Sequence, residues 1–126
     1  MTKAAAIYNF FLQFGLPVYE ENSVYSEENA PDFPYLTYEN KADFFSQYDT
    51  TISFDLWYRS TSWVTANAKS QEISTAIGRT GTRILCDDGY ILIMRQSPWA
   101  QNMGDPSDDM VKRINHSLKI RFYTND

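Results

Sequence analysis

The chain has very few of the side chains that most often carry out chemistry. Its 126 residues include one cysteine, Cys86, and one histidine, His116. A lone cysteine cannot form an internal disulfide, so we expect a reducing compartment and a thiol that packs as a small apolar side chain. The Cys and His pairs that bind zinc are missing. His116 provides the one imidazole that could serve as the base beside a nucleophile.

Long apolar runs and basic clusters are also absent. No apolar run approaches the ~18 residues that a membrane span requires, and the first residues lack the apolar segment and cleavage site of a signal peptide. The formal net charge is -5, and no stretch concentrates Lys and Arg. We therefore expect no membrane span, no export signal and no specific nucleic-acid binding.

The glycines and acidic residues do not form known ligand-binding loops. Gly15 and Gly78 are expected at helix ends, so neither opens a phosphate-binding loop. Residues 105–109 lack the alternating ligands and central glycine of a calcium loop. The acidic stretch 20–32 is typical of a solvated loop, with metal binding as the less favoured alternative. The sequence leaves open a catalytic pair of carboxylates that meet only in the fold, but we expect no enzyme, no cofactor and no metal site.

The chain does contain enough apolar surface for one folded domain over residues 1–126. Hydrophobic residues make up 43% and aromatic residues 16% of the sequence. Residues 50–59 show the longest alternation, which predicts a central, half-buried strand. The apolar side of that strand carries Ile52, Phe54, Leu56 and Tyr58.

Two segments have the spacing of helices packed on a core. The first covers residues 3–14 and ends at Gly15 and Pro17. Its apolar face consists of Ile7, Phe10, Phe11 and Phe14. The second covers residues 63–77 and follows the capping hydroxyls of residues 60–62. Its packing face consists of Trp63, Ala66, Ser70, Ile73 and Ile77.

Further strands are predicted at residues 34–39, over 82–95 as a hairpin turning at Asp88 and Gly89, and at 117–123. An alternative to a loop after the first helix is a short edge strand that contains Val18, Tyr19, Val24 and Tyr25.

The expected fold is therefore α+β. We expect a mixed, mostly antiparallel sheet of about five strands with two helices packed on it, in the order α-β-β-α-β-β-β, and a long loop before the last strand. The core between the sheet and the second helix should contain Phe54, Leu56, Ile73, Ile77, Ile120 and Phe122.

Two sets of residues are candidates for a subunit interface. Asp55, Trp57 and Arg59 share the polar side of the central strand, which either the first helix or a neighbouring subunit should cover. The second set lies in residues 97–113, where two prolines and Gly104 oppose regular structure. It consists of Trp99, Met103, Asp105, Asp108, Asp109 and Met110. We expect a projecting arm that becomes ordered on binding, with an inert surface loop as the alternative.

Four patterns between residues 34 and 123 point to a family. Pro34-Tyr35-Leu36-Thr37-Tyr38 is followed by Ile52-Ser-Phe-Asp-Leu-Trp-Tyr-Arg-Ser, by a helix rich in Ser, Ala and Lys, and by Asp108-Asp-Met-Val-Lys-Arg before the final strand. This order resembles that of the tail terminator (tail completion) proteins of long-tailed bacteriophages. The acidic stretch 20–32 is a departure from the family pattern.

The resemblance implies a non-enzymatic virion protein. Proteins of that family form a hexameric ring that caps the tail tube, stops its polymerisation and gives the head connector a docking surface. The implied partners are other copies of this chain, the tail tube protein and the head-tail connector protein. The implied location is the tail-neck junction of the virion, after synthesis in the host cytoplasm. The alternatives are another head-tail connector or neck protein, or a small cellular protein-interaction domain.

Overall fold

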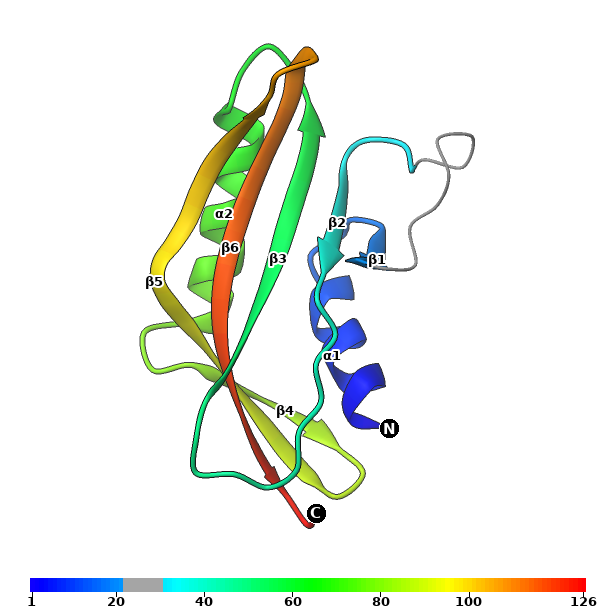
Figure 1. The fold of residues 1–126 in the computed structure, drawn as a ribbon, viewed down its shortest axis with the longest axis vertical. Helices are drawn as coiled ribbons and strands as arrows, with labels where there is room; N and C mark the ends of the chain where they lie inside the picture. The colour runs from blue at the N-terminus through cyan, green and yellow to red at the C-terminus, as the bar shows by residue number, and fades with distance from the viewer. Residues whose placement is uncertain (22–30) are drawn as a thin grey trace.

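The computed structural model describes residues 1–21 and 31–126, which form two helices and six strands (Figure 1). In chain order these are α1 (Lys3–Leu12), β1 (Val18–Glu20), β2 (Tyr35–Tyr38), β3 (Thr50–Arg59), α2 (Val64–Ile77), β4 (Thr82–Cys86), β5 (Gly89–Asp105) and β6 (Asp108–Thr124). The predicted central strand has the bounds of β3, and α2 begins one residue later than expected.

The strands form one sheet in the order β1-β2-β3-β6-β5-β4. Only β1 and β2 are parallel, and the other pairs are antiparallel. The expected α+β fold with a mixed, mostly antiparallel sheet is confirmed, but the sheet has six strands instead of about five. The additional strand is β1, which makes the order α-β-β-β-α-β-β-β. Three residues are too few to show a period of two, so β1 left little signal in the sequence.

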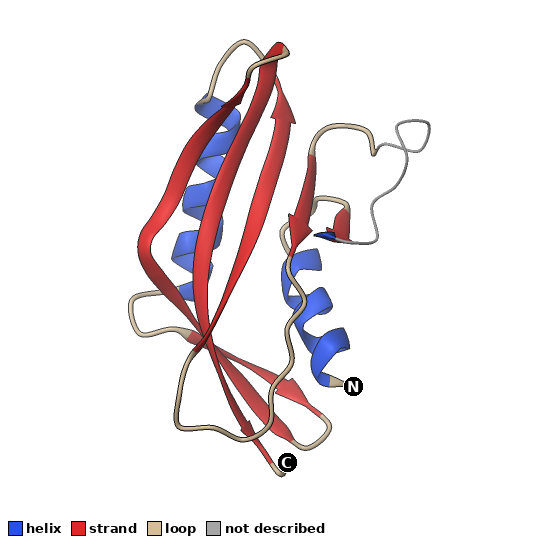
Figure 2. Ribbon diagram, viewed as in Figure 1, coloured by secondary structure: helices blue, strands red, loops and turns tan. Residues whose placement is uncertain are grey.

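Both helices pack on the same face of the sheet, which we call the inner face (Figure 2). The ring of Phe11 in α1 lies 5.2 Å from Phe54. Ser70 in α2 lies 2.8 Å from His116, whose ring stacks on Phe54 at 4.2 Å. The apolar side chains of β3 point to one side only, so both helices must share that side to bury their own apolar faces. The alternative that the first helix covers Asp55, Trp57 and Arg59 is therefore wrong.

The core matches the sequence prediction closely. All of the six side chains expected between the sheet and α2 are buried, as are the four apolar residues of the first helix. On α2 the stripe from Ala66 to Ile77 is buried, and Trp63 is partly buried against the same cluster. Cys86 packs against the core as a partly buried side chain.

Residues 97–113 do not form the predicted loop, because β5 and β6 run through them. Pro98 lies in a bulge, where β5 carries extra residues between Arg95 and Ala100 while β6 advances only from Leu118 to His116. Residues in a bulge leave the ladder, so a proline there removes none of its hydrogen bonds. From Ala100 to Gly104, β5 again pairs with β6.

The end of this hairpin is a tight turn between Asp105 and Asp108. Pro106 lies in the turn, and the Ser107 amide donates to Asp105 Oδ1 at 2.8 Å. The residues that suggested a long loop are thus confined to a bulge and a turn. The expectation of an arm without structure of its own is wrong in this respect.

The hairpin formed by β4 and β5 turns one residue earlier than predicted. Asp87 and Asp88 form the turn, and Gly89 opens β5 with φ of 152°. A Cβ on Gly89 would lie 2.1 Å from the carbonyl oxygen of Tyr123, so a close approach of two backbones requires glycine here. Of the possible edge strand, Val18 and Tyr19 belong to β1, while Val24 and Tyr25 lie outside the described residues, as do Glu27 and Glu28.

Candidate functional site

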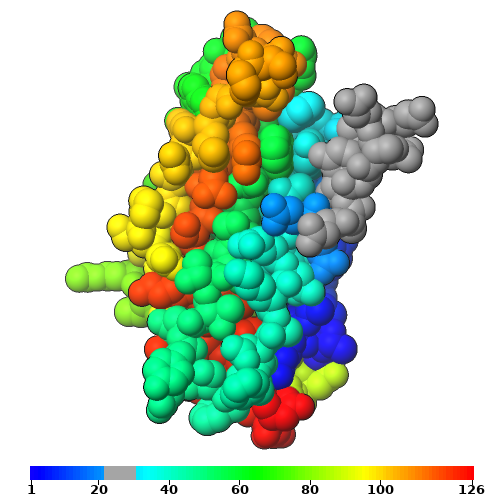
Figure 3. Space-filling model, viewed as in Figure 1, coloured from blue at the N-terminus to red at the C-terminus, as the bar shows by residue number. Residues whose placement is uncertain are grey.

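The face of the sheet opposite the helices, which we call the outer face, is viewed directly in Figure 3. Strands β3, β5 and β6 are visible there without a helix over them. Six of the nine candidate interface residues lie on this face or at the β5–β6 turn that borders it: Asp55, Trp57, Arg59, Met103, Asp105 and Asp108. A guanidinium–carboxylate contact of 3.4 Å between Arg59 and Asp108 links the end of β3 to the turn. The fold thus brings together two sets that are far apart in the sequence.

Trp57 forms the aromatic centre of the outer face. Its ring stacks on Tyr35 of β2, with centroids 5.8 Å apart, and the guanidinium of Arg113 lies 4.9 Å from it on β6. The indole Nε1–H donates to Thr37 Oγ1 at 2.9 Å. Stacked aromatics and an arginine are the side chains most enriched where protein surfaces bind one another.

Asp55 is held between two donors of β6. Its Oδ2 accepts from Arg113 Nη2 at 3.0 Å, and its Oδ1 accepts from Asn115 Nδ2 at 2.7 Å. The carboxylate is nearly buried and both of its oxygens are hydrogen-bonded, which fixes the two strands in register on this side.

A shallow cavity of about 200 Å³ lies between the Trp57 region and the hairpin turn. Its lining includes Trp57, Asp105, Val111 and Arg113. The Ser107 hydroxyl donates to Asp105 Oδ1 at 2.7 Å and lowers the pKa of that carboxyl. A hollow lined by an aromatic ring, a carboxylate and a guanidinium suits a protruding side chain from another molecule.

Of the remaining three candidate residues, Asp109 and Met110 lie beside the β5–β6 turn, and Trp99 lies in the bulge. Trp99, in the bulge, contacts the inner face, with its ring 4.9 Å from that of His116 and 5.8 Å from that of Phe54. The carbonyl of Met110 accepts from the Ser60 amide, and Asp109 is exposed beside the turn. No interface role follows for Trp99, because the bulge directs it into the core.

A second exposed feature, at the opposite end of the molecule from the β5–β6 turn, was not among the predicted site residues (Figure 1). The segment between β2 and β3 exposes Phe44 by 69%, Phe45 by 56% and Tyr48 by 72%. It is tied to the end of the chain by hydrogen bonds from the amides of Phe45 and Ser46 to Asp126 and Phe122. In the sequence, this exposed feature was indicated by three aromatic residues in a stretch without strand periodicity.

The contact that the histidine makes with a hydroxyl group in the described part of the chain is enclosed. His116 Nε2 lies 2.8 Å from Ser70 Oγ, and both residues are buried between α2 and the sheet. Burial lowers the pKa of His116 to about 4. The pair therefore holds α2 on the sheet and offers no nucleophile to a substrate in solvent.

The described part of the chain contains no candidate metal centre. Within it, no three His, Cys, Asp or Glu side chains gather closely enough to hold a metal ion. Neither of the two described helices has the length and apolar character needed to cross a bilayer. Comparison of the chain with protein-family models, with curated proteins and with solved structures gives no match.

Proposed function

We propose that this chain is a ring-forming virion protein of the tail-terminator type. In this role it caps the tail tube, stops tube polymerisation and offers the head connector a docking surface. The observation that supports the proposal is the outer face. Both helices lie on the inner face, so the described residues leave an aromatic and charged sheet surface open along β3 and β6. The choice of the tail-terminator type rests on the order of the sequence patterns between residues 34 and 123, which resembles the order in that family.

A closed ring needs two different surfaces on each subunit, because each copy meets one neighbour on either side. We assign the outer face around Trp57 and the β5–β6 turn to one contact. The exposed aromatic loop, defined as residues 43–48, is assigned to the other. The two surfaces lie at opposite ends of the molecule, so one copy can contact two neighbours without competition between them (Figure 1).

Light scattering coupled to size-exclusion chromatography tests the assembly. The chain alone, or mixed with a tail tube protein, should elute as a hexamer. A chain that stays monomeric at every concentration and with tube protein present would contradict the ring and favour the small interaction domain.

A pair of matched variants locates the contact. Gln101 is exposed on β5 opposite Asn115, on the outer face, whereas Asn67 is exposed on α2. Gln101→Arg places a long charged side chain in the proposed contact and should abolish the ring. Asn67→Arg makes the same change on the helical side and should assemble normally. Both variants should keep the stability of the parent, because both positions are exposed.

A ring that tolerates Gln101→Arg and is broken by Asn67→Arg would assign the contact to the helical side. That result would overturn the proposed interface while leaving ring formation intact.

A further inference from the structure

A cavity of about 380 Å³ lies between the carboxyl end of α2 and the bulge of β5. Its lining includes Ser74 of α2, Arg79 just beyond the end of that helix, and Arg95, Gln96 and Trp99 of β5. None of the described residues that line it is acidic. Two guanidinium groups therefore face one space without a carboxylate in its walls.

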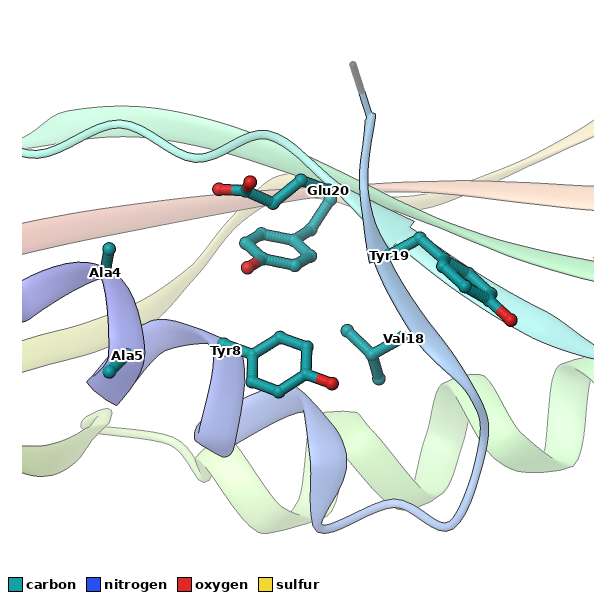
Figure 4. Close-up of a pocket in the computed structure, with 7 residues that line it drawn as sticks. Ala4, Ala5, Tyr8, Val18, Tyr19 and Glu20 are labelled. Carbon is teal, nitrogen blue, oxygen red and sulfur yellow. The ribbon is translucent and has the colours of Figure 1, made fainter. Parts of the chain in front are cut away.

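A second cavity, of about 330 Å³ between α1 and the β1 edge of the sheet, has the opposite character (Figure 4). Tyr8 and Val18 project towards each other there, and the Glu20 carboxylate lies across the space from the helix. Tyr38 of β2 also contributes to its lining. Glu20 already has an interaction within the chain, so the charged group of this second cavity is engaged.

The positive charge at the bulge is not neutralised by the described part of the chain. None of the ion pairs among the described residues includes Arg79 or Arg95. The carboxyl end of α2 carries about half a negative charge, which is less than the two positive charges of the guanidiniums. The cavity therefore keeps a surplus of positive charge, although the formal net charge of the chain is -5.

Arg95 is held in a fixed position. Its Nη1 donates to Ser74 Oγ at 2.9 Å, and Ser74 is buried in α2. A guanidinium has five N–H donors, so this contact leaves most of them for another acceptor. A side chain that is already held in place loses less conformational entropy when it binds a ligand.

The bulge adds neutral hydrogen-bond donors to the two arginines. Gln96 Oε1 accepts from Thr51 Oγ1 at 3.1 Å, so the amide nitrogen is the end of this side chain that can donate. The indole Nε1–H of Trp99 is buried and has no acceptor among the described residues. The exposed Ser97 contributes a hydroxyl group to the lining. Donors around a positive centre are the groups that recognise an oxyanion.

We propose that this cavity binds the phosphate or carboxylate group of an organic ligand. Arg95 donates to two oxygens of the anion through its planar fork, and Arg79 binds it from the solvent side. The volume is within the range of ~300 to 1,000 Å³ for small-molecule sites, so the rest of the ligand occupies the remaining space beside Trp99. The site shares no lining residue with the cavity beside Trp57 and does not depend on ring formation.

The test is a titration of the chain with inorganic phosphate, with sodium chloride adjusted to keep the ionic strength constant. The three tryptophans of the chain give three indole N–H signals in an NMR spectrum. The Trp99 signal should shift and saturate, whereas the signals of Trp57 and Trp63, which lie outside the lining, should not. Equal shifts of all three signals, or a Trp99 signal that does not move, would overturn the proposal.

Two arginine variants give a matched control. Arg79 and Arg83 are both exposed, so neither change should alter folding. Arg79→Gln should raise the dissociation constant for phosphate about tenfold, the loss expected for one charge-assisted hydrogen bond. Arg83→Gln removes the same charge from β4, outside the lining, and should change it less than about twofold. Equal effects of the two would mean that net charge alone attracts the anion, and the site would be rejected.

A third variant tests the fork of Arg95. Arg95→Lys keeps the positive charge but loses the paired N–H donors, so phosphate should bind about tenfold more weakly. An unchanged dissociation constant would place the anion away from Arg95 and overturn the proposed geometry.

Two further probes decide the source of the oxyanion. Glycerol 3-phosphate represents a small phosphorylated molecule, and Nα-acetyl-glutamate-N-methylamide represents an acidic side chain of a protein. Tighter binding of the phosphate ester supports a small-molecule ligand, and tighter binding of the glutamate derivative supports a protein partner. If neither compound shifts the Trp99 signal, the proposal fails.

Discussion

His116 is buried without charge beneath α2, and this makes folding stability depend on pH. Its pKa is lowered to about 4 in the folded chain by burial, whereas an imidazole in an unfolded chain titrates near its ordinary value of ~6.5. Between these values the unfolded chain binds a proton that the folded chain excludes. Stability should therefore fall as the pH decreases from about 6.5 to about 4, by up to roughly 3 kcal/mol.

Since His116 is the only histidine of the chain, its ring protons report its titration directly. In the native protein we expect no titration of these NMR signals above about pH 5. In His116→Gln, the urea midpoint should fall less steeply with decreasing pH than in the parent, because the carboxylates common to both proteins cancel in the comparison. A native imidazole that titrates near its ordinary pKa would contradict this account.

At the scale of elements, Phe54 joins the sheet to both helices. Its ring lies 5.2 Å from that of Phe11 in α1 and 4.2 Å from that of His116, which bonds Ser70 of α2. Phe54→Ala should reduce the free energy of unfolding by ~3 to 5 kcal/mol, because both helices lose a packing partner. Phe44→Ala removes the same atoms from an exposed site and should cost less than ~0.5 kcal/mol.

Chemical denaturation at constant m-value measures both changes. A loss below ~1 kcal/mol for Phe54→Ala would place this ring outside the packing that holds the helices.

The elements with short-range signals were predictable from the sequence. β3 alternates over its whole length, and the stripes of α1 and α2 match their buried faces. Residues 97–113 were not predictable in the same way, because their strand structure comes from pairing between β5 and β6. Pro98 and Pro106 disfavour strand structure, and this local signal was stronger than any strand alternation in the segment. In the fold, Pro98 lies in a bulge and Pro106 lies in a turn, so neither prevents the strands from pairing.

The candidate sites show the same division. Asp55, Trp57 and Arg59 were identified because one strand carries all three at alternate positions. The cavity between α1 and the β1 edge was not identified, because Tyr8, Val18 and Tyr38 come from separate elements and meet only after folding. The side of the sheet that α1 covers was also undecided from the sequence, since its stripe fits either face.

At the scale of the whole molecule, the two proposed contact surfaces can be separated by mixing. Phe44→Ser with Tyr48→Ser removes the exposed aromatic loop contact, and Gln101→Arg blocks the outer face. Neither protein alone should form a ring. A mixture of the two retains one intact pair of surfaces and should give a dimer that cannot grow.

Light scattering on the mixture distinguishes the outcomes. A mixture that stays monomeric would indicate that the aromatic loop and the outer face do not bind each other. Full rings from either variant alone would show that its altered surface lies outside the contact.

The position of β6 has a consequence for synthesis of the chain. This strand is the last of the described elements to leave the ribosome, yet it lies between β3 and β5 and pairs with both. Until it emerges, the β1-β2-β3 part and the β4–β5 hairpin have no strand to join them, and each presents a free edge. The pairing of Thr50 with Ile120 closes a long stretch of chain at once. The sheet is therefore completed only after β6 has been translated, and until then the unpaired edges of β3 and β5 are open to pairing with other chains.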